Sequence, residues 1–237
     1  MIYLNYNPVF KRLLDILLSL TSLLFFWPLF IIIAILIRID SKGPIIFRQK
    51  RYGQDKNHFY ILKFRTMCME TPSDMPTHKL DNPDACITRV GKILRKTSLD
   101  ELPQLLNILK GEMSIIGPRP VVLCEHDVIR ERDKYGANDI KPGITGWAQI
   151  NGRDELSAYE KAKFDGEYTS QVSFYNDFKI FLKTIFYVIK REGVREGSQD
   201  ITSPQPNMQL IVNKPLNKKK SINNTPIQTM EKQASVR

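Results

Sequence analysis

The chain has 237 residues, enough for one domain with its own hydrophobic core, and it carries a formal net charge of +10. This positive charge favours an anionic partner, which could be membrane phospholipid, a nucleotide or nucleic acid. The three cysteines form no C-x-x-C pair, which argues against a disulfide framework and a structural zinc site, and the three histidines lie too far apart to suggest a metal site.

Residues 13–37 form the most apolar segment of the chain. A helix of this length could span a bilayer, since each residue adds about 1.5 Å. Lys11 and Arg12 precede the segment and further basic residues follow it, so the positive-inside rule assigns both ends to the cytoplasm. Pro28 stands in the middle, where its ring and missing N–H disturb a helix. We therefore predict that residues 1–40 form a re-entrant helix hairpin that bends at Pro28 and anchors the protein to a membrane.

The next stretch changes to a strand pattern. Residues 45–50 and 58–64 are rich in strand formers and flank a short polar turn, which predicts a β-hairpin. Its basic residues, among them Arg51 and Lys63, could form a solvated strand edge. They could equally attract lipid headgroups or a substrate diphosphate. Prolines and scattered polar residues between 70 and 86 predict a loop.

Four leucines between residues 102 and 109 recur at i, i+3, i+4 and i+7, which predicts a helix with all four on one face. Gly111 is suited to the C-terminal cap of this helix. The helix could start with a capping box formed by Ser98 and Glu101, or it could begin at Pro103, a residue favoured in the first turn. Both alternatives place Asp100 and Glu101 at a helix N-terminus.

The adjacent carboxyl groups of Asp100 and Glu101 have two interpretations. They could simply favour the first turn of the helix. Alternatively, one is a nucleophile and the other a metal ligand, because neighbours on a helix point roughly 100° apart and need not share one role. Arg95 precedes the pair, and residues 117–120, with the sequence GPRP, follow it. The two prolines make a rigid loop that presents Arg119, either as a structural turn or as a planar fork for phosphate.

The remaining segments carry weaker signals. Residues 125–134 are predicted to form a charged helical connector, and residues 141–153 a glycine-rich loop suited to the close approach of a ligand. Residues 157–168 are expected to form a solvent-facing helix. Residues 173–191 repeat apolar side chains at helical spacing, which suits a helix packed on the core or one lying in a membrane interface. Residues 195–237 are polar and are predicted to be a disordered tail.

Three motifs resemble those of the bacterial sugar transferases, the monotopic polyprenyl-phosphate phosphoglycosyl transferases: SLDELPQ at 98–104, GPRP at 117–120 and KPGITGWAQINGR at 141–153. The resemblance implies an α+β fold, mostly helical, for a monotopic membrane protein with an N-terminal re-entrant helix hairpin, a small β-hairpin and interfacial amphipathic helices. The family usually breaks its re-entrant helix at a Ser-Pro pair, where this chain has Trp27-Pro28. Residues 41–194 would be a catalytic domain on the cytoplasmic face of the bacterial inner membrane.

The resemblance also implies a reaction. A sugar 1-phosphate would move from a UDP-sugar to undecaprenyl phosphate, releasing UMP through a covalent aspartyl-phosphosugar intermediate. This would be the first membrane step of exopolysaccharide, O-antigen, capsule or glycoprotein glycan synthesis, with either a hexose or an N-acetylated amino sugar. Asp100 would be the nucleophile and Glu101 its catalytic partner, and both would be ligands of a magnesium ion. The expected substrate-binding residues are Arg51, Lys63, Arg95, Pro118, Arg119, Pro120 and Arg153.

Membrane lipid, a second copy of the chain and downstream glycosyltransferases are further candidate partners in this interpretation. The alternative is a non-catalytic basic adaptor that binds membranes, or a nucleic-acid binder, since the charge suits both. Nucleic-acid binding favours aromatic residues interleaved with basic ones on an exposed surface, whereas here the basic residues crowd around the apolar segment. An adaptor has no need of an Asp-Glu pair between arginine-bearing loops. We therefore expect an enzyme and no nucleic-acid partner.

Overall fold

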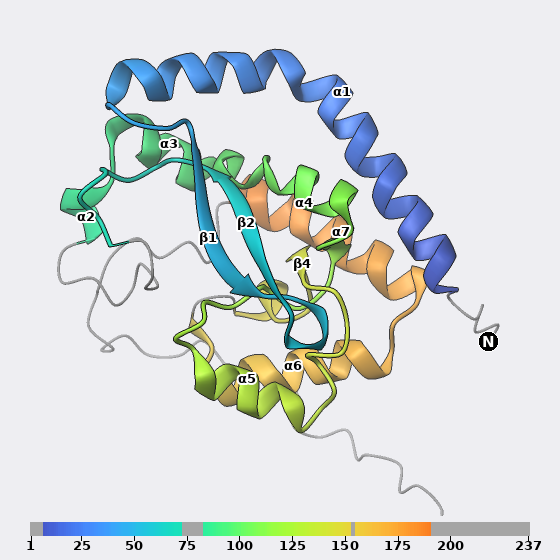
Figure 1. Ribbon diagram of the computed structural model, residues 1–237. Helices are drawn as coiled ribbons and strands as arrows, with labels where there is room; N and C mark the ends of the chain where they lie inside the picture. Colours follow the sequence, from blue (N-terminus) through green and yellow to red (C-terminus); the bar gives the residue numbers. More distant parts are fainter. Residues whose placement is uncertain (1–6, 73–82, 153–154, 191–237) are drawn as a thin grey trace, which may run out of the picture. The chain divides into compact units, whose positions relative to one another are not determined.

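The N-terminal segment is one long helix, α1 (Pro8–Asp40), in a computed structural model that describes residues 7–72, 83–152 and 155–190. The Asn7 side chain caps its start by accepting a hydrogen bond from the Val9 amide. Pro28 lies inside the helix, and Figure 1 shows that α1 changes direction partway along its length. A proline removes one helical hydrogen bond and commonly causes such a bend. The apolar helix is confirmed, while its re-entrant placement in a membrane stays a prediction.

Most apolar side chains of α1 are exposed. Its buried residues are Asp15, Ser19, Ile33 and Ile37. Within the described part of the chain, α1 is also the one helix that is long and apolar enough to cross a membrane. Its exposed large apolar residues are Val9, Phe10, Leu13, Leu17, Leu18, Leu20, Leu24, Phe25, Trp27, Ile31, Ile32, Ile35, Leu36 and Ile39. An apolar surface that extends along a whole helix is typical of contact with a membrane or a partner.

The predicted β-hairpin is confirmed. It consists of β1 (Ile46–Tyr52) and β2 (His58–Phe64), which are antiparallel and pair along their whole length. The connection contains η1 (Gln54–Lys56), in which Asp55 and Lys56 have positive φ angles. On β2, Phe59 and Ile61 are buried in the core.

A series of short helices follows the hairpin: α2 (Pro83–Cys86), α3 (Arg89–Thr97), η3 (Leu99–Glu101) and α4 (Gln104–Lys110). The capping box predicted at Ser98 is wrong. Ser98 ends α3 with a left-handed backbone, with a φ of 56°, and although it also precedes η3, its side chain makes no capping hydrogen bond there. The alternative start at Pro103 is close to the structure, and Gly111, with a φ of 89°, ends α4 as predicted. The short α2 occupies the end of the predicted loop, of which residues 73–82 lie outside the described ranges.

The buried face of α4 differs from the predicted leucine face. Leu105 is buried, but Leu106 is 41% exposed. Asn107 and Ile108 are fully buried instead. The Asn107 amide takes this position because it bonds backbone N–H and C=O groups of β2, which a leucine could not satisfy.

The second half of the described chain contains β3 (Ser114–Ile116), α5 (His126–Asp133), β4 (Gly143–Thr145), η4 (Gln149–Asn151), α6 (Ala158–Ser170) and α7 (Phe174–Lys190). Here helices α5, α6 and α7 (Figure 1) accompany a small parallel sheet. The helices expected near 125–134, 157–168 and 173–191 are therefore present. The expectation that the second of these faces solvent is partly wrong, because Ala162, Asp165 and Gly166 of α6 are buried.

Helix α7 packs on the core, as one of its two alternatives predicted, while its placement in a membrane interface stays a prediction. Ile180 is buried in a core cluster with Ile116, Ile150 and Tyr168. On other faces of the helix the large apolar side chains are exposed, namely Phe174, Tyr175, Phe178, Phe181, Leu182, Ile185 and Phe186. The helix therefore packs on the core and also presents an aromatic surface outward.

Three polar side chains in the first half of α1 hold it against the rest of the fold. Lys11 forms an ion pair with Asp177 of α7, with 2.5 Å between Nζ and Oδ2. Arg12 donates to two backbone carbonyl groups in the last turn of α4. Asp15 accepts a hydrogen bond from the Ile115 amide of β3 at 3.0 Å. These contacts fix the first half of α1 to α4, β3 and α7.

Candidate active site

Asp100 and Glu101 lie in η3, a single turn between α3 and α4. Each residue is only 8% exposed. The turn is set by the left-handed Ser98 at its start and continues into α4 through Leu102 and Pro103. The sequence therefore identified the pair as lying just ahead of a helix, although an extra turn of a different kind carries it.

The two carboxylates have different surroundings. Glu101 Oε1 accepts a hydrogen bond from Lys63 Nζ at 2.7 Å and another from Arg119 Nη2 at 3.2 Å. No hydrogen bond among the described residues ends on the carboxylate of Asp100. Glu101 is consequently held in place by two cations, whereas the oxygens of Asp100 keep lone pairs that a ligand or a reacting atom could use.

The site is buried and positively charged. Burial raises the pKa of Asp100, and the positive charge of Lys63 is the largest influence that lowers it. The negative charge of Glu101 also raises this pKa, while Arg95 and Arg119 lower it. Burial likewise lowers the pKa of Lys63, against the attraction of Glu101. Three cations thus surround two carboxylates in a poorly solvated position. Such an arrangement favours an additional anion, such as a phosphate group.

Arg95 reaches the site from α3, and the close approach of α3 to the chain after β2 allows this. Its Nε donates to Thr66 Oγ1 at 2.9 Å. A Cβ at Gly91 would lie 2.1 Å from the carbonyl oxygen of Thr66, so only glycine permits this packing. Arg95 acts on Asp100 through its charge, since it lowers the pKa of that carboxyl.

The GPRP loop and the glycine-rich segment lie directly against each other. The amide of Gly117 donates to the carbonyl oxygen of Thr145, and the amide of Gly143 donates to that of Pro118, both at 2.9 Å. A Cβ at Gly117 would lie 2.4 Å from the Lys141 carbonyl oxygen. Two of the sequence motifs therefore form one structural unit, from which Arg119 extends to Glu101.

Arg51 supports this unit from the hairpin. Its Nη1 donates to the carbonyl oxygen of Pro120 at 2.9 Å, and its other nitrogens bond Gln49 Oε1. Burial and the neighbouring charge of Arg119 lower the pKa of Arg51 to about 10. The described contacts of Arg51 thus hold a loop. Arg153, the other basic residue predicted to bind substrate, lies outside the described residues.

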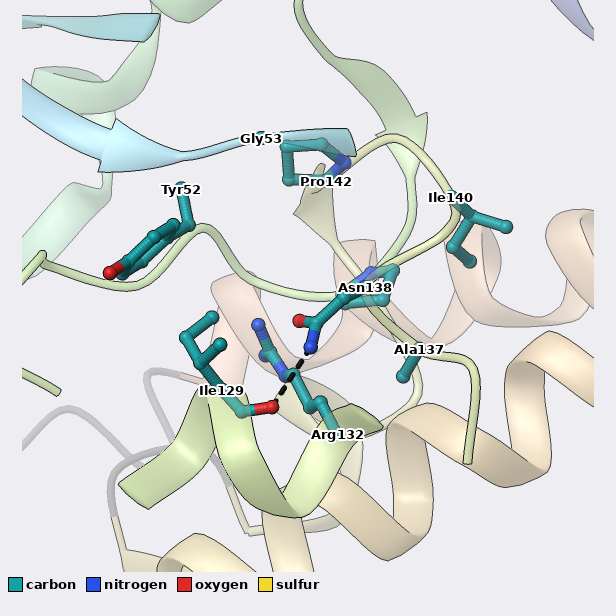
Figure 2. Close-up of a pocket in the computed structure, with 9 residues that line it drawn as sticks. Tyr52, Gly53, Ile129, Arg132, Ala137, Asn138, Ile140 and Pro142 are labelled. Atoms are coloured by element: carbon teal, nitrogen blue, oxygen red, sulfur yellow. Dashed lines mark hydrogen bonds between the residues drawn. The ribbon is translucent and has the colours of Figure 1, made fainter. Parts of the chain in front are cut away.

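A small pocket has Pro118 of the GPRP loop in its lining, and Figure 2 shows the residues around it. It is lined by Tyr52, Gly53, Pro118, Ile129, Arg132, Ala137, Asn138, Ile140 and Pro142. In Figure 2 the Asn138 side chain extends toward Ile129 and donates to its carbonyl oxygen at 2.9 Å. Asp100 and Glu101 do not line this pocket. We therefore locate the candidate active site at the carboxylate pair and not in the pocket.

The only carboxylates that the sequence assigned to a metal are Asp100 and Glu101, and they remain the candidates. The described residues contain no cluster of three or more His, Cys, Asp or Glu side chains able to hold a metal ion. Two adjacent carboxylates can still share a divalent cation with water and substrate oxygens.

Sequence reasoning missed several supporting residues. Arg132 and Asp165 form a buried ion pair with 2.6 Å between Nη2 and Oδ2, and Arg132 also bonds the Arg119 backbone. Gln49 and Thr66 fix Arg51 and Arg95. Gln49 and Thr66 lie in stretches, residues 47–53 and 63–67, that also resemble the bacterial sugar transferases, whereas the only signal for Arg132 and Asp165 is the burial that the fold reveals.

Comparison with known proteins agrees with the motifs. The family model described as bacterial sugar transferase matches residues 6–191. The chain is 42% identical over 187 residues to a UDP-glucose:undecaprenyl-phosphate glucose-1-phosphate transferase of Escherichia coli (strain K12), which covers 76% of this chain and 40% of that protein. It is 39% identical over 197 residues to a UDP-N-acetylgalactosamine-undecaprenyl-phosphate N-acetylgalactosaminephosphotransferase of Aeromonas hydrophila, covering 80% of this chain and 46% of that protein.

A third relative has a length closer to that of this chain. The exopolysaccharide production protein ExoY of Rhizobium meliloti (strain 1021) is 39% identical over 199 residues, which cover 77% of this chain and 87% of ExoY. By contrast, the chain spans less than half the length of the Escherichia coli and Aeromonas proteins. The match to the family model extends over most of the chain, from α1 through α7. The chain therefore belongs to the bacterial sugar transferase family.

Proposed function

We propose that the protein transfers a sugar 1-phosphate from a UDP-sugar to undecaprenyl phosphate and releases UMP. The observation that carries this proposal is the unequal environment of the two buried carboxylates. Glu101 is bonded by Lys63 and Arg119, while the Asp100 carboxylate accepts no hydrogen bond from a described residue. One acid is thus held in place and the other is available to react. The relatives named as undecaprenyl-phosphate sugar phosphotransferases support this choice of reaction.

In the first step, an oxygen of Asp100 attacks the sugar-bearing phosphorus of the donor. The bond between this phosphorus and the bridging oxygen breaks, and UMP leaves with that oxygen. In the second step, a phosphate oxygen of the acceptor attacks the same phosphorus and the bond to Asp100 breaks. The sugar diphospholipid departs and the Asp100 carboxylate is restored. A covalent intermediate of this kind divides one difficult transfer into two easier ones.

The surrounding cations suit this chemistry. Arg119 and Arg95 can bond phosphate oxygens whose negative charge increases during transfer, as arginine does in other phosphoryl transfers. Lys63 holds Glu101 at 2.7 Å and lowers the pKa of Asp100. It therefore increases the fraction of Asp100 that is ionised and able to attack.

Asp100 and Glu101 fit a magnesium ion. Hard divalent cations prefer oxygen ligands, and magnesium is commonly held by one or two carboxylates together with water and substrate phosphates. When bound, magnesium would neutralise charge on the diphosphate and on the leaving UMP.

We further propose that α1 enters the cytoplasmic leaflet of the bacterial inner membrane as a re-entrant helix bent at Pro28, with the catalytic domain in the cytoplasm. Three features support this placement. Apolar residues are exposed along α1 and on α7, basic residues flank α1 at both ends, and the acceptor is a membrane lipid. A second copy of the chain and later glycosyltransferases would meet the protein there. A non-catalytic adaptor is not favoured, because it would not need a buried carboxylate pair among three cations.

The experiment that tests this proposal compares UMP release from several UDP-sugar donors. Purified protein in lipid nanodiscs would be given undecaprenyl phosphate, magnesium and one of UDP-glucose, UDP-galactose, UDP-N-acetylglucosamine or UDP-N-acetylgalactosamine. The proposal predicts UMP release with at least one donor, together with a new sugar-diphosphate lipid. Binding of the lipid without UMP release from any donor would favour the adaptor instead.

A further inference from the structure

The backbone of the GPRP loop is held by one donor on each of three successive carbonyl groups. The Pro118 oxygen accepts from the Gly143 amide, the Arg119 oxygen from Arg132 Nη2 at 3.0 Å, and the Pro120 oxygen from Arg51. Because the two prolines have no N–H, the loop cannot form a regular ladder, and these contacts determine where it lies. Arg132 bonds the residue whose side chain reaches Glu101.

Arg132 is itself fixed by a buried carboxylate. Arg132 is 5% exposed and Asp165 is 1% exposed. Arg132 Nε and Nη2 lie 2.8 and 2.6 Å from the same oxygen, Oδ2 of Asp165. The other oxygen, Oδ1, is buried without a hydrogen-bond partner among the described residues. Among the described residues, Arg132 is therefore the partner that bonds the Asp165 carboxylate and balances its charge.

Helices α5 and α6 approach closely at this point. A Cβ at Gly166, next to Asp165, would lie 2.5 Å from the Cβ of Tyr135. The end of α5 is tied down as well, since the Asn138 side chain bonds the Ile129 carbonyl oxygen and Asp133. The guanidinium of Arg132, drawn in Figure 2, thus extends from this closely packed helix pair to the Arg119 carbonyl of the GPRP loop.

Stability alone does not explain this pair. Removing two charges from water costs several kcal/mol each by general estimate, and well-packed apolar residues of similar volume are often as stable or more so. Burial indeed raises the pKa of Asp165, against the attraction of Arg132. The contact of Arg132 with the Arg119 backbone points instead to a geometric role.

We propose that Arg132, oriented by Asp165, is a positioning residue that fixes the backbone of Arg119 and thereby the guanidinium that meets Glu101 and the donor diphosphate. This inference rests on the proposed function. The Arg119–Glu101 contact is already 3.2 Å long, so a small displacement of the loop would break it. A misplacement of about 1 Å in an active site can cost roughly 100-fold in rate.

The test replaces the pair by apolar residues of similar size, Arg132→Met together with Asp165→Leu. This double variant leaves no buried charge behind, so its free energy of unfolding should equal or exceed that of the wild type. Its kcat/KM for UMP release should nevertheless fall roughly 10- to 100-fold. The matched control, Arg130→Met with Asp127→Leu, removes an exposed Arg–Asp pair from the same helix and should leave kcat/KM unchanged.

A second arm asks whether the pair acts through Arg119. In an Arg119→Ala background, the same double replacement should change kcat/KM by less than about twofold, because effects that pass through one residue are not additive. Hydrogen exchange of the peptide covering residues 117–121 gives a readout that needs no turnover. It should become faster in the double variant and stay unchanged in the control.

Several outcomes would overturn the proposal. One is a double variant with wild-type kcat/KM and wild-type exchange at residues 117–121. Another is a full, multiplicative loss in the Arg119→Ala background, which would mean that the pair acts elsewhere. If the double variant does not fold, Asp165→Asn keeps the shape of the side chain and should show the same pattern with a smaller loss. Absence of turnover in the wild type would count against the proposed reaction, while the exchange comparison would still test the positioning.

Discussion

Replacing Lys63 with methionine should move the acid limb of the pH–rate profile to higher pH. Methionine keeps an unbranched apolar side chain but removes the Nζ that lies 2.7 Å from Glu101 Oε1. The charge of Lys63 is also the largest influence that lowers the pKa of Asp100 against burial. Its loss should therefore raise that pKa further above the usual aspartate value.

The sign of the effect follows from the form of Asp100 that attacks. The carboxylate is the nucleophile, so activity is present above the pKa of Asp100 and disappears as the pH falls through it. Removing the Lys63 cation takes away the largest influence that favours the ionised form of Asp100. On the acid limb, kcat/KM of the variant should therefore lie below that of the wild type, and the two should converge at higher pH.

The variant should still fold. Removing one partner of a buried ion pair costs about 3–5 kcal/mol when the other charge is left alone. Arg119 continues to donate to Glu101 at 3.2 Å, and the burial that lowers the pKa of Lys63 means that its own charge is unfavourably placed. We therefore expect a loss of about 1–2 kcal/mol in the free energy of unfolding.

The assay is kcat/KM for UMP release as a function of pH, measured from the plateau down to the acid pH at which activity is nearly lost. Lys50→Met is the matched control, because Lys50 is an exposed lysine on the same hairpin. It should leave the profile unchanged. An acid limb at the wild-type position in Lys63→Met would refute the account of how Asp100 is tuned.

Two further predictions concern α1. Asp15→Leu removes the acceptor of the Ile115 amide at a residue that is 6% exposed. The free energy of unfolding should drop by about 1–3 kcal/mol in chemical denaturation, and no drop would mean that water replaces the carboxylate. Pro28→Leu restores a regular helix and should shift α1 toward a spanning topology. A single cysteine introduced at Lys42 should then change its labelling by a membrane-impermeant thiol reagent in intact cells, and identical labelling with and without the proline would argue against a role for Pro28 in the bend.

Local patterns were sufficient for much of the fold. The β-hairpin, the helix ending at Gly111 and α7 each follow from side chains that are neighbours in sequence. The start of α4 was ambiguous because the left-handed backbone of Ser98 depends on how α3 ends, which the S-x-x-E pattern does not encode. The exposure of Leu106 was missed for a similar reason, since the hydrogen bonds that keep Asn107 on the buried face of α4 are made to β2, which is distant in sequence.

The candidate site residues were proposed from motifs, but the contacts between them could not be predicted. Lys63 and Glu101 are 38 residues apart in sequence, and Arg119 is 18 residues from Glu101. No periodic pattern indicates that both cations meet one carboxylate oxygen. Arg132 and Asp165, 33 residues apart, looked like ordinary charges on surface helices. Only the close packing of α5 and α6 reveals that they are buried.

The central claim is that the Asp100 carboxylate attacks the donor and carries the sugar phosphate. The most direct measurement is intact-protein mass spectrometry of the protein mixed with a donor that it turns over, without acceptor, followed by peptide mapping. The account predicts a mass increase of one sugar phosphate on the peptide that contains Asp100, its disappearance when undecaprenyl phosphate is added, and no adduct on Asp100→Asn. Loss of a helix-favouring carboxylate alone would cost only about 0.5–2 kcal/mol of stability. Near-normal turnover by Asp100→Asn, or an adduct that maps to another residue, would contradict the account.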